Sequence, residues 1–96
     1  MSPFKRKKLT KIRLELDRLD NSLINIIKKR TNLVKKVLAL KESKNQIVDQ
    51  KRIKRILKNI KKKSIKNNID PKITNRIWKN MIWSYIDFER RNFKKK

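Results

Sequence analysis

Cations placed within apolar helical stripes are the residues of this sequence best suited to bind a small anion. Arg30 interrupts a stripe of apolar residues spaced three and four apart, and Lys41 follows eleven residues later. Eleven residues bring an α-helix back to nearly the same direction, so both side chains point from one face, roughly 16 Å apart along the axis. Val34 and Val37 lie between them. Two long cationic side chains above this apolar floor can close on a small anion.

A further cation, Arg13, lies too far away to join this pair from the same helix. Seventeen residues separate it from Arg30, which corresponds to roughly 25 Å along a helix. In an antiparallel pair of chains, however, Arg13 of one chain lies beside Arg30 and Lys41 of the other. The spacing therefore predicts a site shared between two subunits.

Two carboxyl groups are candidates to complete this site. Glu89 ends a stripe that passes through Trp78 and Tyr85 and otherwise faces the core. Asp49 and Arg52, three residues apart, share the first turn of a predicted helix. Together these residues describe a pocket for a small ligand with several negative charges.

Each of these residues also has a purely structural explanation when it is taken alone. Arg30 could be a core cation paired with Glu89, Asp49 could be only a helix cap, and Lys41 could be an exposed surface residue. Buried ion pairs and caps are common in proteins that have no site at those positions. Only the convergence of several such residues favours a binding pocket.

One long helix must position the cations. Its apolar stripe predicts a helix from Leu9 to Glu42, roughly 50 Å long, with apolar residues at Ile12, Leu16, Leu19, Leu23, Ile26, Leu33, Val37 and Leu40. A second stripe lies beside the first, which widens the apolar face. The rest of so short a chain cannot cover this length, so we expect a second copy of the chain to pack against it.

Two shorter helices follow the long one. Asp49 is expected to cap a helix that ends near Lys66, and Asp70 with Pro71 is a strong start signal for a third helix that reaches about Phe93. The pattern predicts an all-α fold of three helices, without strands. We expect one domain over residues 1–96, with a basic tail over residues 1–8 and another over residues 94–96.

The composition excludes several classes of chemistry. The 96 residues include no Cys, His or Gly, so thiolate or imidazole metal sites, His-assisted nucleophiles and glycine-rich phosphate loops are absent. No cofactor is expected. The sequence has neither an apolar stretch of membrane-spanning length nor a signal-peptide pattern. These features favour a cytoplasmic protein with no membrane partner.

The net charge of +23 raises the question of a nucleic-acid partner. The 31 Lys and Arg residues against 8 acidic residues would attract phosphate strongly. Many of the lysines, however, come in runs that are typical of solvated surface. Because charge alone is a weak discriminator, solvated surface is the favoured explanation and nucleic-acid binding is considered unlikely.

Three segments resemble the all-helical, AroQ-class (type II) chorismate mutases. IRLELDRLDNSLINIIKKRTNLVKKVLALK is similar to the first helix of that family, with its arginines and its closing lysine at the expected spacings. IVDQKRI resembles the entry to the second helix, and IDPKITNRIWKNMIWSYIDFE resembles the third helix with its terminal Gln or Glu. The resemblance covers nearly the whole chain.

The resemblance implies an intertwined homodimer that converts chorismate to prephenate in phenylalanine and tyrosine biosynthesis. By carry-over, Arg30 and Arg13 of the partner chain hold the substrate carboxylates, and Lys41 and Glu89 bind the ether oxygen of the breaking bond. Asp49 lies near the ring hydroxyl. Arg52 supports the carboxylate end, and Tyr85 lines the pocket. A pericyclic rearrangement needs no nucleophile, metal or proton relay, which suits the composition.

Ile53 departs from the family pattern. Most of these mutases carry a glutamate at this position that binds the substrate hydroxyl, so recognition of the hydroxyl falls to Asp49 and backbone groups here. An apolar residue at this point is also similar to the isochorismate-pyruvate lyases, which share the fold and form salicylate. Asp49 favours the mutase. A basic helical nucleic-acid-binding protein without enzymatic activity is the second alternative.

Overall fold

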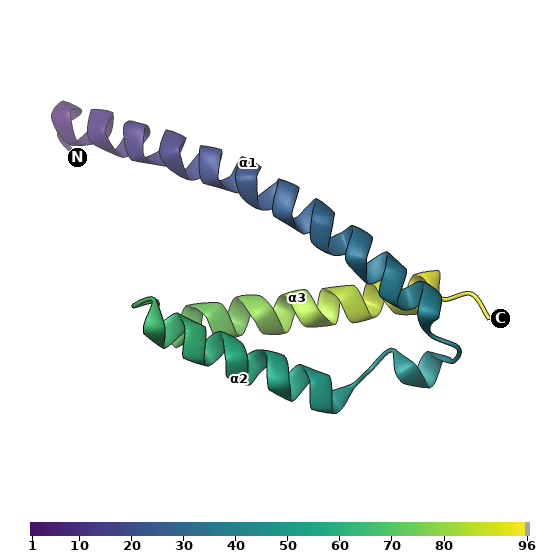
Figure 1. Cartoon of the computed structure of the whole chain (residues 1–96). Helices are drawn as coiled ribbons and strands as arrows, with labels where there is room; N and C mark the ends of the chain where they lie inside the picture. Colours follow the sequence, from purple (N-terminus) through teal and green to yellow (C-terminus); the bar gives the residue numbers. More distant parts are fainter. Residues whose placement is uncertain (96) are drawn as a thin grey trace. The chain divides into compact units, whose positions relative to one another are not determined.

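The computed structural model describes residues 1–95 as three α-helices and one short 3₁₀ turn (Figure 1). The elements are α1 (Pro3–Leu40), the turn η1 (Lys44–Gln46), α2 (Gln50–Lys66) and α3 (Pro71–Asn92). No strand occurs within the described residues, so the predicted all-α fold is confirmed. None of the helices over this range is long and apolar enough to cross a membrane. The chain comprises two compact units, Met1–Leu33 and Val34–Lys96.

The first unit contains α1 as far as Leu33, and the helix begins six residues before the predicted start at Leu9. Ser2 explains the early start, because its Oγ accepts a hydrogen bond from the backbone N–H of Lys5 at 3.2 Å and so caps the helix. Pro3 then occupies the first helical position, where its missing N–H costs nothing. The basic residues 3–8, predicted to form a tail, are therefore the first turns of α1.

The apolar stripe of α1 lies largely exposed. The helix has no buried residue along its whole length. Its apolar side chains keep about half or more of their surface exposed at Ile12, Leu16, Leu19, Leu23 and Ile26. Burial of apolar surface is the main favourable contribution to helix packing. The exposed stripe makes little of this contribution within the single chain.

The second unit begins with the last turns of α1, which end at Leu40 instead of the predicted Glu42. The side chain of Gln46 accounts for this end, because its Oε1 accepts hydrogen bonds from the backbone N–H groups of Glu42 at 2.6 Å and Ser43 at 3.2 Å. These bonds fold the chain into η1. The predicted polar connector therefore contains a defined turn.

The predicted starts of α2 and α3 are confirmed. The Asp49 side chain accepts a hydrogen bond from the backbone N–H of Arg52 at 3.0 Å, and the Asp70 side chain accepts one from Lys72 at 2.9 Å. Each bond satisfies an N–H that has no partner within the helix. Pro71 follows its cap as the first residue of α3.

The turn between α2 and α3 is a Schellman motif built without glycine. Asn68 has a positive φ of 57°, which asparagine tolerates better than most residues. The backbone N–H of Asn68 bonds the carbonyl of Ile65 at 3.2 Å, and that of Ile69 bonds the carbonyl of Ser64 at 2.8 Å. This turn folds α3 back along α2.

Helices α2 and α3 lie side by side and form the small core of the second unit (Figure 1). Ile47, Ile82 and Ile86 are buried, and partly buried apolar side chains pack against them at Val48, Ile53, Ile56, Leu57 and Phe93. At the other end of the pair, the hydroxyl groups of Ser64 and Thr74 share a hydrogen bond of 2.6 Å. The chain leaves α3 after Asn92, and Lys96 lies outside the described residues.

Candidate active site

An ion pair between Lys41 and Glu89 is the centre of the candidate site. The Nζ of Lys41 donates to both oxygens of the Glu89 carboxylate, at 3.0 Å and 3.2 Å. The side chains are only 18% and 6% exposed. Because Lys41 directly follows α1 and Glu89 lies near the end of α3, this contact joins segments 48 residues apart. A buried charge needs such a partner to be tolerated.

The buried face of α3 brings Glu89 to this position. Ile82, Ile86 and Glu89 are the buried residues of the helix, at spacings of four and three. The carboxylate therefore lies within the buried stripe of α3, and Phe93, four residues later, also packs against the core. Tyr85, one turn before Glu89, is half-buried. The structure pairs Glu89 with Lys41 and gives Lys41 a role beyond an exposed surface lysine.

Lys41 and Asp49 line one open hollow of about 580 Å³. Its walls come from the last residues of α1, the turn η1 and the first turn of α2, including Asn45, Gln46 and Lys51. Asp49 caps α2 with one carboxylate oxygen, and it also provides the only carboxylate among the hollow's lining residues. The hollow thus combines lysine ammonium groups, a carboxylate and side-chain amides above apolar walls.

Lys51, Asn45 and Gln46 were missed as candidates at the sequence level. Lys51 stands among many other lysines, and nothing in its spacing marks it. Asn45 and Gln46 lie in a connector whose path depends on the hydrogen bonds of Gln46. A search for side-chain amides in the short connector before the Asp49 cap would have pointed to both.

Ile53 and Arg52 take different places at the start of α2. Ile53 is half-buried and packs against the core residues Ile47, Ile82 and Ile86. It is not among the residues that line the hollow of Lys41 and Asp49. Arg52 is exposed. The backbone N–H of Arg52 donates a hydrogen bond to the carboxylate of Asp49. The Asp49 cap and the guanidinium group of Arg52 therefore belong to the same turn.

Arg13 and Arg30 lie on α1 in the first unit, where Arg13 is exposed and Arg30 is half-buried. The second unit alone brings together Lys41, Glu89 and Asp49. The approach of the two arginines to that group stays a prediction.

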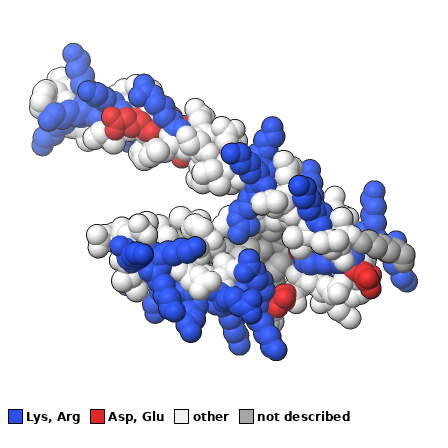
Figure 2. Space-filling view, viewed as in Figure 1, with Lys and Arg blue, Asp and Glu red and all other residues white. Residues whose placement is uncertain are grey.

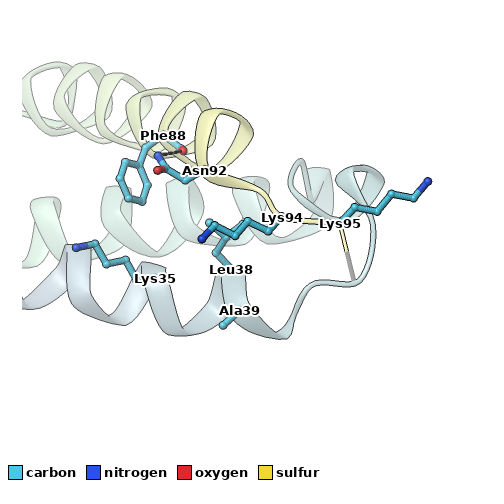
Figure 3. Close-up of a pocket in the computed structure, with 7 residues that line it drawn as sticks. All are labelled: Lys35, Leu38, Ala39, Phe88, Asn92, Lys94 and Lys95. Carbon is cyan, nitrogen blue, oxygen red and sulfur yellow. Dashed lines mark hydrogen bonds between the residues drawn. The ribbon is translucent and has the colours of Figure 1, made fainter.

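A second open hollow, of about 420 Å³, lies on a different part of the second unit (Figure 3). Its lining includes the apolar residues Leu38, Ala39 and Phe88 together with Lys35, Lys94 and Lys95, and the side chain of Lys95 points away from the others in Figure 3. The side-chain amide of Asn92 donates to the carbonyl oxygen of Phe88 at 2.8 Å. None of the residues predicted for the site lines this hollow. The ion pair and Asp49 are therefore the better indication of where chemistry occurs.

The groups at the site can hold and polarise an anion, and no Ser, Thr or Cys side chain is among the residues that line the hollow. Within residues 1–95 no cluster of three or more His, Cys, Asp or Glu side chains could hold a metal ion. An ammonium group and a hydrogen-bonding carboxyl group at a half-buried position suit a reaction that needs orientation and charge stabilisation.

Comparison with known proteins identifies the family of this chain. The family model described as chorismate mutase type II matches residues 12–90, which include every predicted site residue. No curated protein and no solved structure matched the chain.

Proposed function

The chain belongs to the type II chorismate mutase family, and on this premise we propose that it rearranges chorismate to prephenate at a site that two copies of the chain build together. The observation that carries the proposal is the position of Lys41. This residue pairs with the buried Glu89 and also lines the hollow that contains Asp49. Three of the residues predicted from the family resemblance therefore converge in one unit.

Catalysis of this rearrangement rests on shape and charge. Chorismate carries two carboxylates, and the reaction requires its compact, chair-like conformer. Arg30 and Arg13 of the partner chain hold the carboxylates, which lowers the entropic cost of reaching that conformer. Lys41 donates to the ether oxygen, where negative charge develops as the bond breaks. Asp49 accepts a hydrogen bond from the ring hydroxyl.

Glu89 can assist only when it carries a proton. In the unliganded protein its carboxylate accepts both hydrogen bonds from Lys41, and an ionised carboxylate has no hydrogen to donate. Substrate binding therefore redirects the ammonium group of Lys41 towards the ether oxygen. A protonated Glu89 then donates a second hydrogen bond to the same oxygen.

The exposed apolar stripe of α1 supports the homodimer. Residues such as Leu19 and Leu23 keep more than half of their surface exposed in the single chain. An antiparallel partner would cover the stripe and would bring its Arg13 towards the site. An α1 of 38 residues, roughly 57 Å long, is long enough for both contacts.

The structure weakens the argument for a lyase. The resemblance to isochorismate-pyruvate lyases depended on an apolar residue at Ile53, and Ile53 packs in the core of the second unit. Asp49, which favours the mutase, lines the hollow beside Lys41. We therefore propose no second catalytic function.

The proposal is tested by assaying the purified chain with chorismate and, separately, with isochorismate. We expect prephenate from chorismate, and a loss of about 10²–10³-fold in kcat/KM for Arg30→Ala, because this variant loses the cation that positions a substrate carboxylate. Lys28→Ala, which removes a cation from the polar face of α1, is the matched control and should keep its activity. Faster formation of salicylate and pyruvate from isochorismate, or equal losses in the two variants, would contradict the proposal.

A further inference from the structure

The outer face of α2 carries the densest array of positive charge in any helix of the protein. Nine of its 17 residues are Lys or Arg, none is acidic, and all nine are exposed. Figure 2 shows Lys and Arg side chains projecting from the part of the molecule that α2 occupies in Figure 1. At 1.5 Å per residue the helix presents about one positive charge every 3 Å. The net charge of the chain does not by itself indicate this concentration of exposed cations on one helix.

Within residues 1–95, the ion pairs Lys41–Glu89 and Arg91–Asp87 leave all nine cations of α2 without a carboxylate partner. Like charges recur at intervals of four residues along the helix, at Lys54, Lys58, Lys62 and Lys66. Like charges at this spacing destabilise a helix. Binding of an external anion therefore explains this face better than a contribution to the stability of the helix does.

The opposite face of α2 restricts the kind of partner. Ile53, Ile56 and Leu57 pack against the core that α2 shares with α3. The helix therefore has no free apolar face to insert into a lipid surface, as an interfacial helix does. Its outer face also lacks the aromatic and apolar centre that anchors most protein partners.

A hollow at one end of this face provides a place for a phosphate group. It has a volume of about 520 Å³ and lies between α2 and the start of α3. Lys58, Lys61 and Lys72 line it above Leu57 and Pro71, and no carboxylate is among its lining residues. Three ammonium groups around one hollow are suited to a phosphate oxygen cluster.

We propose that the outer face of α2 binds the phosphate backbone of double-stranded nucleic acid without regard to sequence, with one phosphate in the hollow of Lys58, Lys61 and Lys72. A duplex carries one negative charge for about every 1.7 Å of its axis, so a straight row of cations about 25 Å long matches a regular row of phosphates. α2 has no aromatic residue, and proteins that prefer single strands use aromatic side chains to stack the bases. The duplex is therefore the favoured form. The hollow of Lys58, Lys61 and Lys72 shares no residue with the proposed catalytic site.

The test compares two variants that lose the same charge. One is Lys58→Gln, Lys61→Gln, Lys72→Gln, and the control is Lys5→Gln, Lys7→Gln, Lys11→Gln on α1. Binding to a labelled DNA duplex of about 20 base pairs is followed by fluorescence anisotropy over a range of salt concentrations. Circular dichroism verifies that both variants keep their helices.

Loss of the phosphate contact in the hollow should weaken binding by about 10-fold at about 0.1 M salt and lower the slope of log K against log salt by about 0.9. The control should change affinity by about threefold or less, because it leaves every cation of α2 and of the hollow in place. Equal losses in the two variants would overturn the proposal, since binding would then follow net charge alone. Tighter binding to vesicles containing anionic lipid than to the duplex would overturn it as well.

Discussion

Replacing Lys41 with methionine is expected to leave the Glu89 carboxylate buried without its cation. The side chain of Glu89 is 6% exposed, and Lys41 donates a hydrogen bond to each of its carboxylate oxygens. Removing one member of a buried ion pair typically costs about 3–5 kcal/mol. The 18% exposure of Lys41 lets some water reach the site, so we expect a loss of about 3 kcal/mol in the free energy of unfolding.

The assay is urea denaturation at neutral pH and a fixed protein concentration, because a dimer's apparent stability depends on concentration. The double variant Lys41→Met, Glu89→Leu should recover most of the loss, since a well-packed apolar pair can replace a buried ion pair at little cost. A single variant within about 0.5 kcal/mol of the wild type would refute the argument, because such a value is ordinary for an exposed residue.

Three further predictions concern catalysis, association and the turn. With Glu89→Gln, kcat/KM should be retained because the amide keeps an N–H donor for the ether oxygen, whereas Glu89→Leu should lose activity; equal activity of the two variants would refute the donor role. Leu19→Glu should convert the dimer to monomers in sedimentation experiments, whereas Asn25→Glu on the polar face of α1 should not, and a dimer in both would exclude this interface. Asn68→Ala should lower the free energy of unfolding by about 1 kcal/mol, because a positive φ is unfavourable for alanine, whereas Asn68→Gly should be tolerated. Equal stability of the two variants would show that the turn does not require a residue that tolerates a positive φ.

Local rules were sufficient to predict the helices of the second unit. Asp49 and Asp70 each precede a run with helical spacing of apolar residues, and both accept the expected backbone hydrogen bond. Capping depends on a few adjacent residues, which is why it can be recognised without knowledge of the fold. The bounds of α2 and α3 therefore agree with the predictions to within one residue.

The start of α1 shows how a correct local rule can be overlooked. Ser2 and Pro3 form the same kind of start signal as Asp70 and Pro71, and they cap the helix. The basic residues that follow were interpreted as a solvated tail because no apolar periodicity runs through them. Lysine and arginine are nevertheless good helix formers.

Contacts between distant segments mark the limit of sequence analysis at the site. The stripe on α3 predicted that Glu89 reaches the edge of the core, but it left the partner open between Arg30 and a pocket cation. The pair with Lys41 depends on how the chain turns after α1. With 31 Lys and Arg residues in the sequence, spacing could not single out Lys51 as a residue of the hollow either. The placement of Ile53 in the core likewise depends on which face of α2 meets α3.

Subunit complementation tests the shared site most directly. Arg13→Ala and Arg30→Ala are each expected to be inactive, because every site in either homodimer lacks one arginine. When equal amounts of the two proteins are unfolded and refolded together, half of the dimers are mixed, and each mixed dimer has one intact site. The mixture should therefore recover about a quarter of the wild-type chorismate mutase activity. A mixture that remains as inactive as its components would contradict a site built from Arg13 of one chain and Arg30 of the other.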